Sequence, residues 1–550
     1  MDNEKWAALN REHILNMATL YPELAERLGA EQVEARPTGS PPQLLSSVVE
    51  RLRAWSGALD VAPASEITAE QDRERRILSD LVKLCAFLDE NAPAVGPAQP
   101  ALEQAMIDLA PALASGVSAA VLERTTRVIE ALPASLAPAD EEERGCIALE
   151  LELGRGVAEA APELLDLLVS SARDADADEA LVSRLDAGVT RAKEALSAHV
   201  EQLEAREAAE PGAALWGAEQ LEELCARLRL PYGLDELREI AAETQNELQV
   251  ELRRAAQRTE EEASTSEALA RAREQQPVSV EAGLAALRSS IDAACAFLGE
   301  RVLLTLPAVG NPEIRAMPTA LARCSEAPRV VPPPPQEDTG LVLIALPEEE
   351  GPLSGFSSPE LANLAQRVAF PGEYLARVSA LRVAPGVRWL SQLCAGLPGA
   401  AAWAADLTGG WSGFAVEMMC ERGFASAPVE TLVLVEESRR DALLASVDLE
   451  VNLGELAPEA ALARLVAEAG RTPTQARVEV CQMLRAPLRR AAAMVGTSRL
   501  FELRRHAKEL WLQSYSPALF HDFVLSAGAV PLCYLVEAIA ALQIAAPEER

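Results

Sequence analysis

The sequence predicts a mainly α-helical protein that carries a small β-sheet. Ala, Leu, Glu and Arg, which favour helices, make up long segments in which apolar residues recur three and four positions apart. Pro and Gly gather in the short stretches between these segments. One compact apolar run, Leu341 to Leu346, lies between Gly340 and Pro347 and has the length of a buried strand.

Amphipathic helices are expected along the first half of the chain. The spacing of apolar residues predicts helices over 44–59, 70–88, 181–208 and 234–264. Connections between helices are expected at 92–100, 133–139 and 210–213, where Pro or Gly interrupts the pattern. The steady helical pattern over 550 residues favours one large body with an N-terminal and a C-terminal half.

A Pro-rich connection, 307–359, separates the N-terminal helical half, 1–306, from the C-terminal helical half, 360–550. The connection contains the predicted strand, for which 302–306 and 431–435 are candidate partners. It also contains an acidic run, 348–350, and four consecutive prolines, 332–335. The prolines indicate a stiff spacer, with binding to a proline-recognition domain as the alternative.

The most informative stretch is 367–376, which reads Arg-Val-Ala-Phe-Pro-Gly-Glu-Tyr-Leu-Ala. Upstream, Ser357-Ser358-Pro359-Glu360 predicts a helix start with Pro in the first turn, so Arg367 is expected near the end of that helix. Pro371-Gly372 then suits a backbone bend that leads into a further helix.

This stretch resembles the centre of a bacterial family known as domain of unknown function 885, whose members read His-Glu-x-x-Pro-Gly-His-(His/Tyr)-Leu-Gln there. That family is similar to helical zinc carboxypeptidases. The resemblance runs nearly end to end, since 20–29, 216–237 and 520–532 also match its segments. It implies a large two-lobed helical zinc-peptidase-like fold with a central cleft and a small β-sheet beside the cleft.

Every residue that the resemblance assigns to the zinc site has changed. Arg367, Val368 and Glu373 replace His, Glu and His, and Ser412 replaces the Glu that is the family's third ligand. Catalytic zinc needs three imidazole or carboxylate ligands and a nearby base, whereas Arg367 brings a fixed positive charge and Val368 cannot accept a proton. The C-terminal half therefore carries a degenerate metal site, and zinc is expected to be absent.

Further cleft positions of the family have also lost their polar groups. Glu450 stands where the family has His, Gln482 and Met483 where it has Arg and Tyr, and Ala493 where it has Tyr. The joint loss of ligands, base and binding residues predicts a noncatalytic peptidase-like protein, a pseudoenzyme that acts as a binding or regulatory scaffold for an unknown protein or peptide.

Two alternatives stay open, namely a structural helical assembly protein and a hydrolase or peptidase with an atypical metal site held by carboxylates. Calcium or magnesium accepts such all-oxygen ligands. The carboxylates that could contribute to this site are Glu373, Glu417, Glu421, Asp448 and Glu450. Conversely, an ion pair between Arg367 and Glu373 would fill the former metal site.

Composition narrows the classes of partner. The net charge of -34 argues against nucleic acid or an anionic membrane, because phosphate binding needs clustered Lys and Arg. No basic stretch followed by an apolar run opens the chain, and no segment offers the roughly 20 uninterrupted apolar residues of a membrane span. We therefore expect no membrane span and a soluble, cytoplasmic protein.

Cysteine and histidine usage supports the expectation of a soluble, cytoplasmic protein without a zinc site. The nine cysteines are scattered and mostly lie in apolar helical runs, which is typical of buried reduced thiols. No histidine falls between residues 200 and 505, and His521 is expected to be a structural hydrogen-bonding residue. Ser412 lies among glycines in 409–413, where a turn residue is expected rather than the nucleophile of a catalytic triad.

Overall fold

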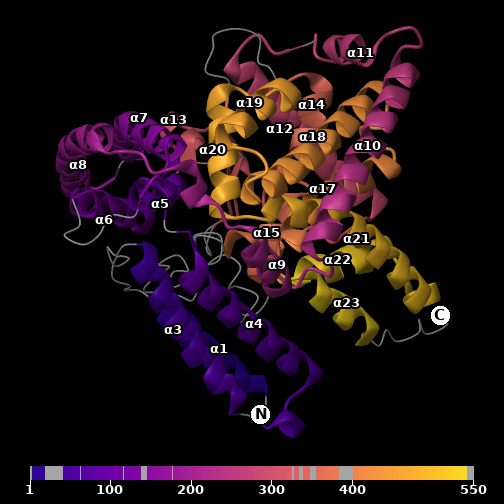
Figure 1. The fold of residues 1–550 in the computed structure, drawn as a ribbon, viewed down its shortest axis with the longest axis horizontal. Coiled ribbons are helices and arrows are strands. Elements are labelled where there is room, and N and C mark those ends of the chain that lie inside the picture. The colour runs from indigo at the N-terminus through magenta and orange to yellow at the C-terminus, as the bar shows by residue number, and fades with distance from the viewer. Residues whose placement is uncertain are drawn as a thin grey trace.

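The computed structural model describes residues 3–18, 41–61, 63–93, 95–115, 117–137, 145–175, 177–274, 276–324, 328–333, 338–346, 355–382 and 400–541. Over these residues the protein is mainly helical, with one small sheet of three strands (Figure 1). This confirms the predicted fold class. The family's opening segment, 20–29, the acidic run 348–350 and the last two of the four prolines lie outside the described residues.

Three helices at the N-terminus pack side by side and extend away from the rest of the molecule (Figure 1). They are α1 (Asn3–Ala18), α3 (Pro41–Asp60) and α4 (Ala69–Asn91). Trp55 lies fully buried between them, where its indole Nε1 donates a hydrogen bond to Asn10 Oδ1 at 3.0 Å and its ring stacks on His13. Thr68 caps α4 through a hydrogen bond with Gln71, which fixes where that helix begins.

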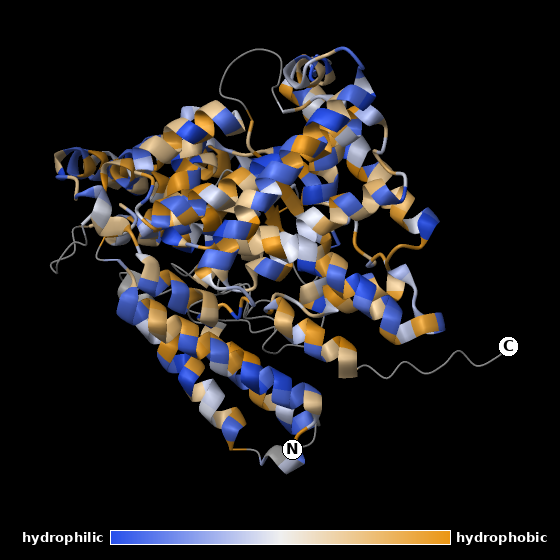
Figure 2. Ribbon diagram, turned by 45° about the vertical axis from the view of Figure 1, so that its right-hand side comes forward, coloured by the Kyte–Doolittle hydropathy of each residue, from blue (hydrophilic) through white to orange (hydrophobic). Residues whose placement is uncertain are grey.

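A second helical group, at the left of Figure 1, follows in sequence. It consists of α5 (Pro100–Leu109), α6 (Ala119–Ser135), α7 (Ala148–Asp174) and α8 (Glu179–Ala205). The apolar faces of these helices form one core together with the short helix α13 (Thr319–Cys324). Figure 2 shows the sequence pattern that produces such a core, in which hydrophobic and hydrophilic residues alternate along the helices.

The remaining helices build the main body. In the first half of the chain these are α9 (Ala218–Arg227), α10 (Leu234–Thr259), α11 (Thr265–Ala272) and α12 (Val280–Arg301). In the second half they are α14 (Ser358–Val368), α15 (Glu373–Arg382), α17 (Ala405–Glu421), α18 (Pro428–Asn452), α19 (Pro458–Ala469), α20 (Pro473–Arg485), α21 (Arg489–Trp511), α22 (Pro517–Ser526) and α23 (Leu532–Ala541). Short 3-10 helices are Ala64–Glu66, Ala110–Leu113, Pro211–Ala214, Ala400–Ala402 and Leu512–Ser514.

The sheet has the strand order β1-β3-β2. Its central strand β3 (Leu341–Ile344) pairs in parallel with β1 (Glu313–Ala316) and antiparallel with β2 (Arg329–Val331). All four residues of β3 are buried, which confirms the predicted strand. Val342 and Ile344 join the main core, while Leu341 and Leu343 join the core of the second helical group, so β3 connects the two.

Both predicted partners of that strand were wrong. Segment 302–306 forms no strand because side chains of α22 occupy its hydrogen-bonding groups. The carbonyl of Leu303 contacts the ring of His521. Thr305 donates to Asp522 through its amide at 2.8 Å and through its hydroxyl at 2.6 Å. Segment 431–435 lies inside α18, because Pro428 and a capping contact from Glu430 start a helix just before it.

The predicted helices exist with shifted ends. Helix α10 ends at Thr259 rather than near 264, where Ser264 instead caps α11. Helix α6 runs through Pro133 to Ser135, so the connection predicted at 133–139 begins later than expected. The connections at 92–100 and 210–213 do separate helices.

One helix of the described residues, α12, is long and apolar enough by composition to cross a membrane. Leu287, Ile291 and Leu298 on one face of this helix are buried in the main core, and Arg288 donates to the carbonyl oxygen of Ile314 at 2.8 Å. Helix α12 thus packs as a core helix against the sheet and α14.

Candidate functional site

Helix α14 begins and ends where the sequence predicted. Glu360 caps the start of the helix, since the amide and hydroxyl of Ser357 donate to Glu360 Oε2 at 3.1 and 2.7 Å. Pro359 occupies the first turn, where a missing amide hydrogen costs nothing. The helix ends at Val368, so Arg367 lies in its last turn.

The bend at Pro371-Gly372 holds the end of α14 against the start of α15. A Cβ atom on Gly372 would lie 2.0 Å from the carbonyl oxygen of Arg367, so only glycine fits there. The carbonyl of Pro371 accepts a hydrogen bond from Trp411 Nε1 of α17 at 2.8 Å. The two residues that remain of the motif therefore serve the scaffold.

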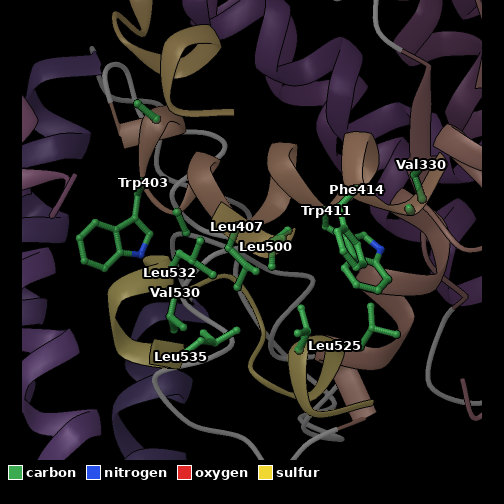
Figure 3. Close-up of a cluster of buried hydrophobic side chains, with 14 of the residues drawn as sticks. Val330, Trp403, Leu407, Trp411, Phe414, Leu500, Leu525, Val530, Leu532 and Leu535 are labelled. Carbon is green, nitrogen blue, oxygen red and sulfur yellow. The ribbon is translucent and has the colours of Figure 1, made fainter. Parts of the chain in front are cut away.

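The aromatic core behind this bend comes from several helices. Trp411 and Phe414 of α17 lie together beside Leu525 of α22 (Figure 3), and all three are buried. The ring of His521 contacts both aromatic residues at centroid distances of 6.0 and 5.7 Å. His521 Nδ1 lies 2.7 Å from the carbonyl oxygen of Leu303, which confirms its predicted role as a structural hydrogen-bonding residue.

Arg367 pairs with α18, so the predicted ion pair with Glu373 was wrong. Its Nη1 donates to Asp441 Oδ2 at 2.7 Å. Burial disfavours the charged guanidinium, but Asp441 and Glu437 outweigh that effect and raise the pKa of Arg367. Glu373 instead pairs with Arg377 of its own helix at 2.6 Å, because the bend at Pro371-Gly372 turns the two predicted partners toward different helices.

The other former metal-site positions add no metal ligand next to Arg367. Val368 is buried in the main core. Ser412 lies inside α17, so the expected turn at 409–413 was wrong. Glu417 also lies on α17, and burial raises the pKa of this carboxyl to about 7, with Arg367 opposing the shift. The site thus holds a permanent cation close to acidic groups that partly neutralise it.

The glycines of 409–413 serve helix packing. A Cβ atom on Gly409 would lie 2.6 Å from the Cβ of Ala493, and one on Gly410 would lie 2.6 Å from the backbone of Gly496. The hydroxyl of Thr497 donates to the carbonyl of Gly410 at 3.2 Å. Helices α17 and α21 therefore approach closely, and Ala493, one of the former cleft positions, fills part of this contact.

The remaining former cleft positions contact separate parts of the structure. Glu450 pairs with Arg464 of α19 at 2.7 Å. Gln482 Nε2 donates to the carbonyl of Cys324 at 3.4 Å, and Met483 is buried with its carbonyl accepting from Asn452 at 3.1 Å. These three residues are therefore engaged in packing the scaffold.

Asp448, one of the carboxylates considered for a metal, caps a helix. Its Oδ2 accepts from the backbone amide of Arg490 at 3.1 Å, and its Oδ1 accepts from Asn452 Nδ2 at 3.0 Å. Burial raises the pKa of this carboxyl to about 7 despite these hydrogen bonds. Asp448 thus stabilises the start of α21.

The five candidate carboxylates do not converge on one point, although Glu417 and Glu421 lie one turn apart on α17. Glu373, Asp448 and Glu450 have the separate partners described above, and Glu421 pairs with Arg504 at 2.8 Å. No three His, Cys, Asp or Glu side chains of the described ranges are grouped so that they could hold a metal ion. The donor set at 367, 368, 373 and 412 does not fit the zinc that the family resemblance implies.

Three arginines interact electrostatically with Glu373, and sequence reasoning missed them. Arg377 of α15 pairs with the carboxylate of Glu373, whose charge also acts on Arg329 of β2 and on Arg489 of α21. The sequence signal is the pair Arg489-Arg490, which stands at the start of α21.

Burial leaves the charges of Arg329 and Arg489 poorly compensated. It lowers the pKa of Arg329 to about 10, with Arg377 adding to the shift, and the buried Nε of Arg329 has no hydrogen-bond partner among the described residues. Burial, with the charge of Arg490 adding to it, also lowers the pKa of Arg489. Arg490 itself is compensated, because its guanidinium contacts the buried Glu479.

The cysteines are free thiols, as predicted, over the described residues. Cys85, Cys146, Cys225, Cys324 and Cys481 are buried, and burial raises the pKa of each. Cys394 lies outside the described residues. Thiols in this state are inert, so they add no nucleophile to the site.

Comparison with known proteins gives the family and the fold. One similar structure is that of a protein from Shewanella oneidensis described as a lipoprotein of unknown function, with 16% identity, a TM-score of 0.66, and coverage of 96% of this chain and 98% of that chain. Another is that of a protein from Colwellia psychrerythraea described as a lipoprotein, with 14% identity, a TM-score of 0.73, and coverage of 98% of each chain. No curated protein matches the chain. Residues 22–539 match the family DUF885, described as bacterial proteins of unknown function, so the chain belongs to this family.

Proposed function

We propose that this protein is a noncatalytic, peptidase-like member of its family that acts as a binding or regulatory scaffold for a protein or peptide. One observation carries the proposal. Where the family motif calls for a zinc-binding imidazole, this chain has Arg367, whose guanidinium is held by Asp441 at 2.7 Å. A fixed positive charge repels a metal cation, and no protonation change near neutral pH removes it.

The rest of the site supports the same proposal. A base is missing at Val368, which packs into the core, and the hydroxyl at Ser412 is a poor replacement for a carboxylate ligand of zinc. Glu373 is engaged with Arg377. The scaffold around these positions is nevertheless kept by Pro371, Gly372 and Trp411. Loss of chemistry together with retention of shape favours binding over catalysis.

Metal analysis of protein purified without chelator, followed by titration with Zn²⁺, tests the proposal. We expect substoichiometric zinc, no saturable zinc binding, and no peptide hydrolysis that a chelator abolishes. Stoichiometric zinc with chelator-sensitive hydrolysis would overturn the proposal and would favour a peptidase with an atypical metal site.

A combined variant, Arg367→His, Val368→Glu, Glu373→His and Ser412→Glu, returns the family's ligands and base to the scaffold. We expect it to bind zinc more tightly than the natural chain does, because it removes the cation and supplies three ligands. Arg505→His, which adds one exposed imidazole on α21, is the matched control and should leave zinc affinity unchanged. Equal zinc affinity of the combined variant and the natural chain would show that Arg367 and its neighbours do not exclude the metal.

The cytoplasmic location stays a prediction of the sequence. The two structurally similar proteins are described as lipoproteins, and at 14–16% identity their likeness concerns the fold alone. Fractionation of cells that express the protein at its natural level tests the location. Recovery in the membrane fraction would contradict the prediction.

A further inference from the structure

The exposed side of the last turns of α21, at the lower right of Figure 1, differs in charge from the chain as a whole. We propose that it binds a short acidic segment of a partner protein, in which the carboxylates accompany an apolar residue. We call this surface the α21 face, and it consists of Phe501, Arg504, Arg505, Lys508 and Leu512. The inference rests on the proposed function in taking the protein to be a scaffold for a peptide, and it adds the place and the chemistry of that partner.

The residues of the α21 face follow one side of the helix. Phe501, Arg505, Lys508 and Leu512 are separated by four, three and four positions, which places them on the same side of a helix. An open groove with a volume of about 400 Å³ runs along this side and is lined by Phe501, Glu502, Arg504, Arg505 and Lys508. Between Phe501 and Leu512 the helix rises by about 16 Å, which is the length of about five residues of extended chain. A short segment can therefore lie along the whole surface.

Aromatic rings hold two of the cations in place. Cζ of Arg504 lies 4.8 Å from the centroid of the Phe501 ring, and Nη1 of Arg504 pairs with Glu421 Oε2 at 2.8 Å. Nζ of Lys508 lies 5.6 Å from the centroid of the Tyr515 ring. A ring face stabilises a cation without cancelling its charge, as a carboxylate would. Lys508 thus keeps a positive charge that an anion can meet.

Cations outnumber carboxylates here, although carboxylates outnumber cations by 84 to 50 in the whole chain. Charged residues at the end of α17 and between 501 and 512, His506 apart, are the cations Arg422, Arg504, Arg505 and Lys508 and the carboxylates Glu421, Glu502 and Glu509. Glu421 pairs with Arg504, and Glu509 Oε2 lies 3.9 Å from His506 Nδ1. Arg505 and Lys508 are exposed and form no ion pair with any described residue. An acidic segment would supply the missing carboxylates.

Two hydrogen-bond donors beside the α21 face lack acceptors as well. The indole Nε1 of Trp511 and the hydroxyl of Tyr515 are buried without a hydrogen-bond partner among the described residues. The centroids of these two rings are 6.3 Å apart, and Lys508 lies over the Tyr515 ring. Cations without carboxylates and donors without acceptors call for the same complement, namely a partner rich in carboxylate and carbonyl oxygens.

Leu512 gives this surface an apolar end. Its side chain is 73% exposed, and that of the nearby Leu510 is 45% exposed. The backbone of Leu512 has a φ of 47°, in the left-handed region that leucine seldom adopts. Strained residues concentrate where ligands and partners bind, and covering an exposed leucine removes apolar surface from water. The partner segment therefore carries an apolar residue beside its carboxylates.

A protein segment fits this surface better than an anionic membrane or a nucleic acid does. Those partners carry dense arrays of negative charge and are bound by many clustered cations, whereas cations exceed carboxylates by only one on this stretch. They would also be repelled by the rest of a chain of net charge -34. A short segment largely escapes that repulsion, since exposed charges more than about 10 Å apart are screened at 0.1 M salt.

Fluorescence anisotropy of a labelled peptide, Gly-Glu-Glu-Leu-Glu-Glu-Leu-Gly, titrated with the full chain at about 0.1 M salt tests the inference. We expect saturable binding at one site. Arg505→Gln combined with Lys508→Gln should weaken it about tenfold, because two charge-assisted contacts are lost. The matched control is Arg127→Gln combined with Arg155→Gln, which removes two cations of the second helical group that are each 45% exposed, and it should leave the affinity unchanged. Absence of saturable binding, or equal weakening by the control, would overturn the proposal.

A change in the peptide and a change of partner complete this experiment. The same peptide with Gln in place of each Glu should bind about tenfold more weakly, since it keeps the leucines and loses the charge. Equal affinity for the two peptides would contradict the charge complementarity. Vesicles that contain phosphatidylglycerol form the other arm, and binding to them through Arg505 and Lys508 without binding to the peptide would reject a protein segment as the partner.

Leu512→Gly separates a binding role from a structural one. Glycine adopts a positive φ without strain, so the urea midpoint should rise, whereas loss of the apolar side chain should weaken peptide binding. Val278→Gly removes an apolar side chain that is 92% exposed elsewhere, and should leave the peptide affinity unchanged. A lower midpoint for Leu512→Gly together with unchanged peptide affinity would identify a structural residue and contradict the inference.

The two proposals fail separately. Stoichiometric zinc with chelator-sensitive hydrolysis would contradict the noncatalytic function and leave the peptide titration to be judged by itself. Failure to bind the acidic peptide in a protein that holds no zinc would remove the role of the α21 face and leave the noncatalytic function standing.

Discussion

His521 Nδ1 in α22 donates a hydrogen bond to the carbonyl oxygen of Leu303, at a distance of 2.7 Å. Because a carbonyl can only accept, the neutral ring carries its hydrogen on Nδ1. Burial lowers the pKa of His521 to about 4, although the contact with Leu303 opposes the shift. The segment after α12 is thus held by a neutral imidazole, which has a consequence for stability in acid.

Acid should destabilise the protein through His521. The folded pKa of about 4 lies below the ordinary value of 6.5, so the unfolded chain binds the proton first as the pH falls. The contribution of His521 to the free energy of unfolding is full above about pH 6.5 and is lost as the pH falls toward 4. Urea unfolding at a series of pH values measures this loss.

His521→Asn tests the assignment, because the Asn side chain keeps a donor near Nδ1 but does not titrate in this range. Its unfolding free energy should fall less steeply below about pH 6.5 than that of the natural chain. His506→Asn changes an imidazole on the surface of α21 that is 47% exposed, and should keep the natural slope. Equal slopes for the natural chain and His521→Asn would contradict this role for His521.

A second pH effect, of opposite sign, should come from Glu417. Burial raises its pKa to about 7 from an ordinary value of 4.5, so the folded protein holds this proton more tightly than the unfolded chain does. The associated stability is present below about pH 4.5 and is lost as the pH rises through about 7. Glu417→Gln should remove that loss, as measured by unfolding between these pH values.

Arg367→Met provides the internal check on Glu417. Arg367 lowers the pKa of Glu417, so its removal should raise that pKa further, and a carboxyl-labelled NMR titration would report the change. A lower or unchanged pKa of Glu417 in Arg367→Met would mean that the two charges do not act on each other in solution.

Sequence reasoning could predict much of the fold because local patterns cause it. The cap formed by Ser357 and Glu360, the end of α14 at Val368 and the buried strand 341–344 follow from residue types and spacing within a few positions. The partners of that strand do not follow from local spacing, because they depend on contacts with α22. The side chains of His521 and Asp522 form hydrogen bonds with the backbone groups that a strand at 302–306 would have used.

The candidate site was only partly predictable for the same reason. The departures at 367, 368, 373 and 412 from the residues that the resemblance implies are visible in the sequence, but the partner of Arg367 is Asp441, which lies on another helix, and spacing alone favoured Glu373. The arginines whose charges interact with that of Glu373 come from β2, α15 and α21, which are distant along the chain. Only the tertiary arrangement brings Arg329 and Arg489 within range of the charge of Glu373.

Arg485 of α20 should be among the most important polar residues for stability. Its guanidinium lies between Glu103 of α5 and Glu150 of α7, with Nη2 donating to Glu103 Oε1 at 2.9 Å and Nε donating to Glu150 Oε1 at 2.8 Å. Arg485→Met would leave the two carboxylates buried without a counter-ion. Breaking such a buried pair costs about 3–5 kcal/mol of unfolding free energy, which urea denaturation can measure.

Two further variants distinguish burial from ion pairing as such. Arg485→Met combined with Glu103→Gln and Glu150→Gln should recover much of the loss, because no unpaired charge is left. Arg238→Met breaks an exposed pair with Glu455, whose side chains are 42% and 45% exposed, and should cost less than about 1 kcal/mol. A cost for Arg485→Met no larger than for Arg238→Met would contradict the role of burial.

The close approach of α17 and α21 gives the last prediction. A Cβ atom on Gly496 would lie 1.8 Å from the carbonyl oxygen of Asp406, which is backbone and cannot turn aside. Gly496→Ala must therefore push the two helices apart. Overpacking of this kind typically costs about 1–3 kcal/mol, and here it should also weaken the hydrogen bond from Thr497 to Gly410.

Gly57→Ala is the matched control, since Gly57 is exposed on α3 and a Cβ atom there meets nothing within 4 Å. That substitution should stabilise the protein by up to about 1 kcal/mol, because alanine favours the helix. The same chemical change is thus expected to act with opposite signs at two helical glycines, and thermal unfolding of both variants measures it. A stabilised Gly496→Ala variant would show that α17 and α21 do not pack with their backbones in contact.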